Sequence, residues 1–437
     1  MNTILSRLQA YPRSLLYILA LGLILRTAFI SFHQRPLISD EREYDRLAYN
    51  LASKAAYTYD GTPTAYRPIG YPAFVSVFYF VHGHHPVAIK CLQALIDVAT
   101  SLLIYVLLVG YPNRMRVIAA GLWAFNIPAI FYSNLMMSET VFTFLLTLAA
   151  VVLTRYPERR SSSAYHIGIC LGVLVLFKPS ALIFLLVVPF FFRRLSLPLK
   201  NLSLAALAFV LVLAPWFLRN FLTFDRLSLA SNGGINLLIG NNPQATGAYG
   251  ITFDPVILQG AKSEFEADHM AFQSASEYIL QNPGTFVVNA AKKLGRLLES
   301  EGGLLVWTFH PSPEDTHTRY AEKYASIPLS LTLSTNLPYL FMMLLGVFGF
   351  LASKKDPVWW ISSSFAGSWV LLHLIFFGGG RFHFPLMPFV AIYAAQFLSD
   401  PWGSWRNLTI AQKLTGIVVA LLLVSLWTYE GIFVYNA

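Results

Sequence analysis

Acidic residues gather at the start of the segment ISDEREYDRLAYNLASK, residues 38–54. Its apolar side chains recur at helical spacing and form one stripe: Tyr44, Leu47, Ala48, Leu51 and Ala52. This pattern predicts a short helix lying on a membrane surface. An acid beside a membrane can act as a general base whose pKa is tuned by partial burial, and Asp40 with Glu41 is the candidate pair. Asp45 is also close, so the choice of base stays open. The alternative is that these acids only stabilise the positive end of the helix dipole.

Basic residues beside prolines are candidates for binding a phosphate. Arg67 precedes Pro68 in TAYRPIGYPAF, residues 64–74, where two prolines restrict the backbone around one cation. A rigidly held guanidinium favours bidentate contact with phosphate. Lys178 precedes Pro179 inside an apolar stretch, and a lone lysine at membrane depth is costly enough to suggest a function. The alternatives are contact with lipid head groups for Arg67 and snorkelling for Lys178.

Other charged residues stand at the ends of apolar runs. Glu139 in SNLMMSETVF could position a sugar or pair with a cation, or it could be an acid at a helix N-terminus that Ser138 caps. Arg219 in APWFLRNF could contact a donor or form a structural pair. The segment GGGRFHFPLMP holds Arg381 and His383, and Arg381 is a candidate phosphate ligand.

The composition indicates that membrane-spanning helices position these residues. Of 437 residues, 56% are hydrophobic and only 12% are charged, with a mean hydropathy of +0.55. Roughly a quarter of the residues in a soluble chain are charged, so most of this surface does not face water. Only segments that satisfy their own backbone hydrogen bonds cross lipid, and the apolar runs lack strand alternation. We assign the net charge of +9 to cytoplasmic loops and not to nucleic-acid binding.

We therefore predict an all-α polytopic membrane protein with about eleven transmembrane helices, in a single domain over residues 1–437. The segment 165–192 is too long for one crossing and is predicted to form two short spans that meet at Lys178-Pro179. The other predicted spans are 14–32, 87–109, 117–133, 140–153, 201–217, 327–351, 358–377, 384–398 and 414–435.

The distribution of Lys and Arg predicts the orientation. Basic residues collect in the N-terminal tail and in alternate loops, for example at Arg7, Arg13, Arg114, Arg116, Arg155, Arg159, Arg160, Arg193, Arg194, Lys354 and Lys355. This bias favours a cytoplasmic N-terminus, with the first span as an uncleaved anchor. The first outer loop, 33–86, and a large outer loop region, 218–325, then lie outside the cytoplasm. Residues 260–299 predict two helices broken at Asn282-Pro283. The second of these would present a basic side to lipid head groups: Lys292, Lys293 and Arg296.

The first-loop motifs resemble those of a known family. The first span is followed by Asp40-Glu41-x-x-Tyr44, then by Arg67-Pro-x-Gly-Tyr-Pro and a leucine-rich span. This order of motifs resembles that of the polyprenyl-phosphate-sugar-dependent glycosyltransferases of the C type. This class includes the protein O-mannosyltransferases and the lipid A aminoarabinose transferases. The resemblance covers nearly the whole chain in span number and loop placement, and it implies juxtamembrane helices in the first outer loop. Glu43 stands where the aminoarabinose transferases carry an arginine, which argues against an aminoarabinose donor.

The resemblance also implies roles for individual residues. Asp40 is the expected catalytic base, and Glu41 is expected to support it. The donor phosphate or sugar would be bound by Tyr44, Arg67, Glu139, Lys178, Arg219, Arg381 and His383. Most members need no metal, so we expect no cofactor, with a divalent metal as the open alternative. The cluster of His82, His84 and His85 has no Cys and no acid close in sequence, so it does not predict a metal site.

These observations predict an enzyme of the plasma (inner) membrane. It would transfer a sugar from a polyprenyl-phosphate donor to an acceptor hydroxyl on the extracytoplasmic side, with Asp40 as general base. The expected acceptor is an envelope glycan, a glycolipid or a protein; the chain would contact membrane lipid, and no nucleic acid is expected. One alternative is a transporter or flippase for a lipid-linked glycan, which would carry charges through the middle of the bundle. Another is a glycan polymerase, which would lack the Asp-Glu pattern.

Overall fold

The computed structural model describes residues 12–155, 164–189, 199–310 and 320–434, and this part of the chain is mostly helical. A short antiparallel hairpin joins β1 (Thr58–Tyr59) to β2 (Thr62–Pro63). Several basic residues used to predict the orientation lie outside the described residues: Arg7, Arg159, Arg160, Arg193 and Arg194.

Seven helices of the described residues are long and apolar enough to cross a membrane, or eight spans result if the bent pair α6–α7 counts as one. The seven are α2 (Arg13–Phe32), α5 (Pro86–Leu107), α11 (Leu199–Phe224), α17 (Leu329–Ala352), α18 (Pro357–Ile375), the run α19 (Gly380–His383), η5 (Phe384–Leu386) and α20 (Met387–Ser399), and α22 (Ile410–Tyr429). They fall at predicted spans, and the chain is an integral multi-pass membrane protein. The count of eleven stays a prediction, because α8 (Glu139–Arg155) and α9 (Ala164–Phe177) have only 17 and 14 residues.

The predicted span 117–133 is bent by 51° between α6 (Asn113–Ala124) and α7 (Ile127–Ser133). A break inside lipid leaves backbone groups that need partners. Arg26 of α2 supplies one, because its Nη1 donates to the Ala124 carbonyl at 2.7 Å. The Arg26 guanidinium also forms a buried ion pair with Asp97, which makes this charged pair part of the helix packing.

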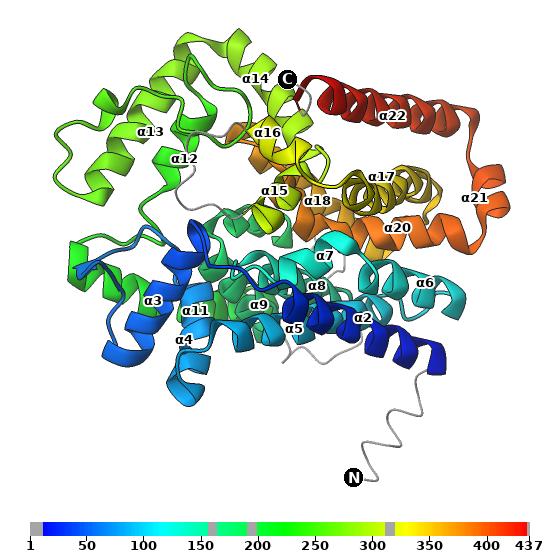
Figure 1. Ribbon diagram of the computed structural model, residues 1–437, viewed down its shortest axis with the longest axis horizontal. Helices are drawn as coiled ribbons and strands as arrows, with labels where there is room; N and C mark the ends of the chain where they lie inside the picture. The colour runs from blue at the N-terminus through cyan, green and yellow to red at the C-terminus, as the bar shows by residue number, and fades with distance from the viewer. Residues whose placement is uncertain (1–11, 156–163, 190–198, 311–319, 435–437) are drawn as a thin grey trace.

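The helices of the first outer loop and part of the large outer loop region lie at one end of the bundle, which we call the site end. Figure 1 shows α3 (Asp40–Lys54), α4 (Gly70–His82), α12 (Gly233–Gly240) and α13 (Glu264–Gln281) together on the left of the picture. The predicted first-loop helix and the two predicted helices of 260–299 are confirmed. Shorter elements complete the described fold: η3 (Pro179–Leu186), η4 (Pro255–Leu258), α14 (Pro283–Leu297), α15 (Gly302–Phe309), α16 (Tyr320–Ala325), α21 (Pro401–Asn407) and η6 (Glu430–Val434).

Close packing at Gly70 places the first loop against the centre of the bundle. A Cβ atom on Gly70 would lie 2.5 Å from the backbone nitrogen of Phe177. Glycine therefore lets the start of α4 contact the end of α9 directly. As a result, Arg67 and Lys178, which are far apart in the sequence, come to line the same cavity.

Candidate functional site

A cavity of about 430 Å³ opens at the site end between segments that are distant in the sequence. Its wall is formed by α3, the start of α8, the break between α9 and η3, α12, and the connection from α18 to α19. The structure brings six of the predicted site residues into this wall: Asp40, Tyr44, Arg67, Glu139, Lys178 and Arg381. We call it the polar cavity.

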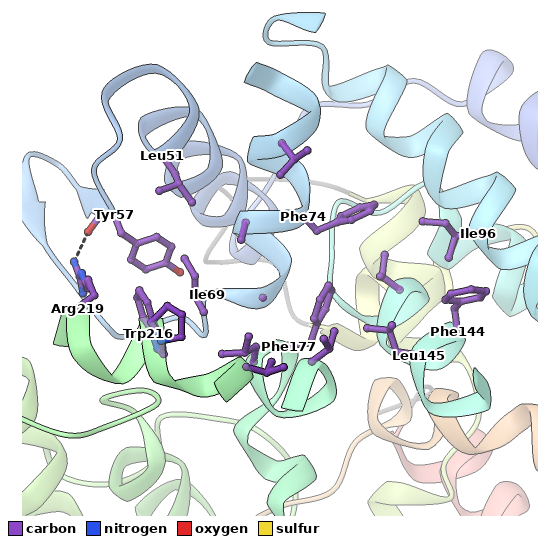
Figure 2. Close-up of a pocket in the computed structure, with 18 of the residues that line it drawn as sticks. Leu51, Tyr57, Ile69, Phe74, Ile96, Phe144, Leu145, Phe177, Trp216 and Arg219 are labelled. Atoms are coloured by element: carbon purple, nitrogen blue, oxygen red, sulfur yellow. Dashed lines mark hydrogen bonds between the residues drawn. The ribbon is translucent and has the colours of Figure 1, made fainter. Parts of the chain in front are cut away.

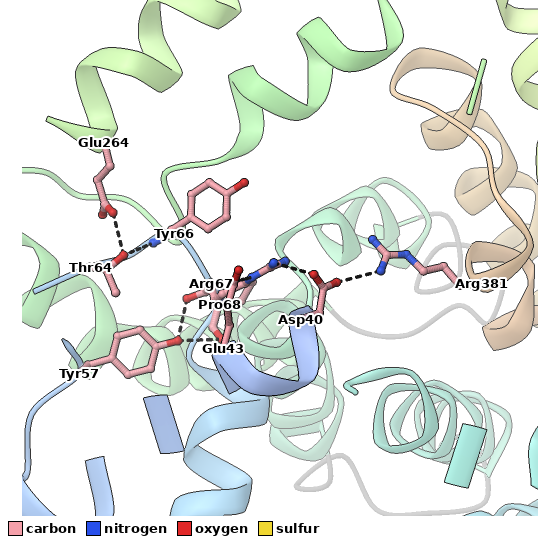
Figure 3. A network of polar contacts seen from close by, with 9 residues as sticks. All are labelled: Asp40, Glu43, Tyr57, Thr64, Tyr66, Arg67, Pro68, Glu264 and Arg381. Carbon is pink, nitrogen blue, oxygen red and sulfur yellow. Dashed lines mark hydrogen bonds and ion pairs between the residues drawn. The ribbon is translucent and has the colours of Figure 1, made fainter. Parts of the chain in front are cut away.

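Asp40 lies between two arginines from opposite ends of the chain, as Figure 3 shows. Arg67 Nη2 donates to Asp40 Oδ1 at 2.8 Å, and Arg381 Nη1 donates to Asp40 Oδ2 at 2.9 Å. Arg67 also donates through Nε to Glu43 Oε2 at 2.5 Å. Each oxygen of the Asp40 carboxylate is therefore engaged by a different guanidinium group.

The charges around Asp40 keep it ionised. Burial raises the pKa of Asp40, but the positive charges and hydrogen bonds of Arg381 and Arg67 outweigh burial and hold that pKa below its usual value. Tyr44, on the same helix, stays neutral because burial raises its pKa to about 12. The polar cavity thus presents a carboxylate and fixed cations to whatever binds in it.

Glu139 and Lys178 form a second charged pair in the polar cavity. Lys178 Nζ donates to Glu139 Oε1 at 2.9 Å, and both side chains are largely buried. Lys178 lies in extended backbone at the predicted break, where α9 ends and Pro179 begins η3. Its ammonium group also lies 5.8 Å from the ring centre of Phe382, so aromatic and charged groups share this part of the wall.

Glu41 lies behind the polar cavity and not in it. Its side chain is fully buried, its Oε2 lies 2.7 Å from Arg35 Nη2, and its Oε1 accepts from the Met136 backbone at 2.8 Å. Met136 precedes Glu139 in the turn that begins α8. Glu41 therefore connects α3 to the turn that carries Glu139.

Arg219 also lies outside the polar cavity, where it holds the segment that leads to Arg67. Its Nη1 donates to the Thr64 carbonyl at 2.8 Å. Glu264 at the start of α13 holds the same segment from the other side, accepting from Thr64 Oγ1 at 2.7 Å and from the Ala65 backbone at 2.6 Å. Figure 3 shows Glu264 beside Thr64. Sequence reasoning missed Glu264, whose only local signal was its position in a first helical turn.

His383 is buried close to Arg381 and does not line the polar cavity. Its Nε2 lies 3.0 Å from Glu301 Oε1, and its Nδ1 lies 2.8 Å from the Leu297 carbonyl. Glu299 accepts from the Gly380 backbone at 2.9 Å. These contacts fix the start of α19, so His383 supports the position of Arg381.

A larger apolar pocket of about 790 Å³ adjoins the polar cavity. Figure 2 shows its lining, which includes Leu51, Tyr57, Ile69, Phe74, Ile96, Phe144, Leu145, Phe177, Trp216 and Arg219. Phe177 lines both hollows. Along the first loop, Arg67 and Pro68 line the polar cavity, while Ile69 and Gly70 line the apolar pocket. The two hollows therefore adjoin at Phe177 and along the first loop.

In the part of the chain that the structure describes, no cluster of at least three His, Cys, Asp or Glu residues could hold a metal ion. His84, from the histidine cluster, instead contacts Asp45 Oδ1 at 2.9 Å. The absence of a cofactor stays a prediction.

The fold is similar to that of a solved oligosaccharyltransferase structure. The apo oligosaccharyltransferase of Archaeoglobus fulgidus matches with a TM-score of 0.51 and 16% identity, over 94% of this chain and 55% of that chain. This match shows a shared fold, so the resemblance to the C-type glycosyltransferases is confirmed at the level of the fold. The chain spans about half the length of that oligosaccharyltransferase.

Two further structures are similar to this chain. The oligosaccharyltransferase AglB from Archaeoglobus fulgidus, in complex with an inhibitory peptide and a dolichol-phosphate, has a TM-score of 0.48 and 16% identity, over 94% of this chain and 54% of that chain. ArnT from Cupriavidus metallidurans, bound to undecaprenyl phosphate, has a TM-score of 0.43 and 11% identity, over 88% of this chain and 78% of that chain. No family model and no curated protein matches the sequence.

Proposed function

We propose that this protein transfers a sugar from a polyprenyl-phosphate donor to an acceptor hydroxyl, with Asp40 as general base. One observation carries the proposal: a cavity with two arginines and a lysine adjoins an apolar pocket. A donor of this class joins a phosphate to a long isoprenoid chain. Its phosphate would lie at Arg67, and its chain would enter the apolar pocket beyond Ile69 and Phe177.

The cations of the polar cavity support phosphate as the leaving group. When the bond between the sugar C1 and the phosphate oxygen breaks, negative charge grows on the phosphate. Arg67 and Arg381 can donate charge-assisted hydrogen bonds to it, and Lys178 adds a third cation.

Donor binding would also prepare Asp40 to act as a base. Both of its oxygens are engaged by arginines, and its lowered pKa makes it a weak proton acceptor. A phosphate that draws Arg67 and Arg381 toward itself frees the carboxylate and raises the pKa of Asp40. Asp40 then takes the proton of the acceptor hydroxyl, the acceptor oxygen bonds to C1, and the polyprenyl phosphate leaves. Asp40 therefore becomes an effective base only when the donor is present.

The remaining wall of the polar cavity would position the sugar. Glu139 and Lys178 offer an acceptor and a donor for hydroxyl groups, and Asn236 of α12 lines the same cavity. Trp369 and Phe382 supply flat apolar surface. We propose that the site end faces away from the cytoplasm, as the distribution of Lys and Arg predicts.

Transfer of a labelled sugar tests the function. Purified protein is incubated with radiolabelled polyprenyl-phosphate sugars and an envelope extract, using wild type, Asp40→Asn and Asp45→Asn. Asp45 lies on the same helix but contacts Tyr79 and His84, so Asp45→Asn is the matched control. We expect transfer by the wild type and the control and a loss of at least about a hundredfold in Asp40→Asn, the scale of a lost general base. Normal turnover by Asp40→Asn would rule out this mechanism.

A further inference from the structure

Helix α14 at the site end is inverted relative to a helix on the surface of a soluble protein. Its inward face carries Asn289 and Lys293, which are buried. Its outward face carries Val287, Val288 and Leu294, which are 68%, 57% and 36% exposed. A water-facing helix normally buries its apolar stripe and exposes its polar residues. The outward face of α14 therefore has the composition of a surface that contacts apolar groups.

Hydrogen bonds to two other segments hold the polar inward face of α14 in place. Lys293 Nζ donates to Asn241 Oδ1 and to the Ile375 carbonyl, each at 2.8 Å. This result corrects the expected basic side of the helix, because Lys293 points inward. Lys292 is exposed, and Arg296 forms an ion pair with Glu299 at 3.5 Å.

The depth of α14 is set by two membrane-spanning helices. Ile375, the partner of Lys293, is the last residue of α18. Trp427, near the site end of α22, donates through Nε1 to the Leu298 carbonyl at 2.9 Å. Figure 1 shows α14 close to the C-terminal end of α22. The C-terminal half of α14 therefore lies at the level where both spans end.

The apolar face of α14 lies on a helix that packs beside a span with exposed leucines. A Cβ atom on Gly295 of α14 would lie 3.4 Å from Leu426 of α22. Leu421 and Leu422 of α22 are 61% and 64% exposed on a helix that is long and apolar enough to span a membrane. The neighbouring α13 exposes Glu266, Gln273 and Glu277 together with Phe272 and Leu280, so its outward face is mixed.

We propose that α14 is an interfacial helix, whose outward face of Val287, Val288 and Leu294 inserts among the lipids at the site end. Lys292 would contact lipid phosphates. An amphipathic helix with apolar residues on one face and basic residues nearby binds a membrane in this way. Because the inward face of α14 holds Ile375, lipid contact would stabilise the connection that carries Arg381 into the polar cavity. The proposal does not depend on the sugar or the acceptor.

Site-directed fluorescence quenching tests it in the full-length protein. Single cysteines replace Val288 or Gln273 in a variant with Cys91→Ala and Cys170→Ala, and each carries an environment-sensitive dye. The protein is placed in nanodiscs of phosphatidylethanolamine and phosphatidylglycerol. Quenching is measured with doxyl-labelled lipids and, separately, with aqueous iodide. Leu294→Cys gives a second reporter on the same face.

We expect the ratio of doxyl quenching to iodide quenching to be several times higher at Val288 and Leu294 than at Gln273. An equal or lower ratio would show that the face lies in water, and the proposal would fail. Protection from both quenchers would also overturn it, because a protein partner or a second copy of the chain would then cover the face.

Discussion

The contact of Glu264 with the first loop leads to a quantitative prediction. Its two carboxylate oxygens accept from Thr64 Oγ1 and from the Ala65 backbone, three and two residues before Arg67. A hydrogen bond to a charged group contributes about 1.5–3 kcal/mol. Glu264→Gln keeps one acceptor oxygen and removes the charge, so it should cost one such bond. If the whole cost is transmitted to Arg67, affinity for a lipid phosphate falls by about ten- to a hundredfold.

Equilibrium binding of undecaprenyl phosphate to the purified protein measures this effect, together with the Tm of each variant. Glu266→Gln is the matched control, because Glu266 is in the same helical turn but accepts only from the exposed backbone of Lys262. We expect wild-type affinity in Glu266→Gln and partial recovery in Glu264→Asp. Wild-type affinity in Glu264→Gln, at unchanged Tm, would refute the reasoning that α13 positions Arg67.

Other substitutions test the packing, the buried acid and the apolar pocket. Gly70→Ala should lower the Tm clearly, because the added Cβ would lie 2.5 Å from the backbone nitrogen of Phe177. Gly284→Ala is the control, because nothing lies within 4 Å of a Cβ at that position. Equal Tm values for the two variants would contradict the close contact at Gly70. Burial raises the pKa of Glu299 to about 7, so its contribution to stability is present below the unfolded pKa and is lost as pH rises through about 7. The Tm should therefore fall between about pH 5 and pH 8, and less so in Glu299→Gln; an unchanged slope in that variant would argue against this assignment. Ala73→Phe should displace roughly two CH₂ groups of a lipid chain from the apolar pocket and lower the affinity for undecaprenyl phosphate about tenfold. It should have little effect on the affinity for a short-chain phosphate. Equal losses of affinity for both ligands would show that the chain binds elsewhere.

Much of the polar cavity could be predicted from the sequence, because unusual residues mark it. Arg67 before a proline and Lys178 inside an apolar run each break the local pattern, and the first-loop motif marks Asp40. Such departures from the local pattern are costly unless they have a function, so they indicate site residues. The seven long spans were also predictable, since long apolar runs have few alternative structures in lipid.

Side-chain direction could not be predicted from proximity in the sequence. Consecutive helical residues point about 100° apart, so Asp40 faces the polar cavity while Glu41 faces the interior and Arg35. Arg381 and His383 diverge in the same way, and only Arg381 lines the cavity. The buried positions of Glu41 and His383 agree with the proposed function, since each of these residues supports an element that carries a cavity residue.

Long-range partners were also beyond sequence reasoning. Glu264 contacts residues two hundred positions away, and nothing near it in the sequence indicates this. Arg219 was expected to contact a donor or to form a structural pair; it lines the apolar pocket and donates to the Thr64 carbonyl, a backbone group that any residue would offer. Such contacts depend on how helices pack and not on local motifs.

A cryo-electron microscopy structure with undecaprenyl phosphate would show whether one amphiphilic donor occupies both hollows. We expect phosphate density within hydrogen-bond distance of Arg67 and Arg381, with Asp40 released from at least one arginine. The isoprenoid chain should run past Phe177 into the apolar pocket. Phosphate bound away from both arginines, or a chain that leaves the apolar pocket empty, would contradict the account.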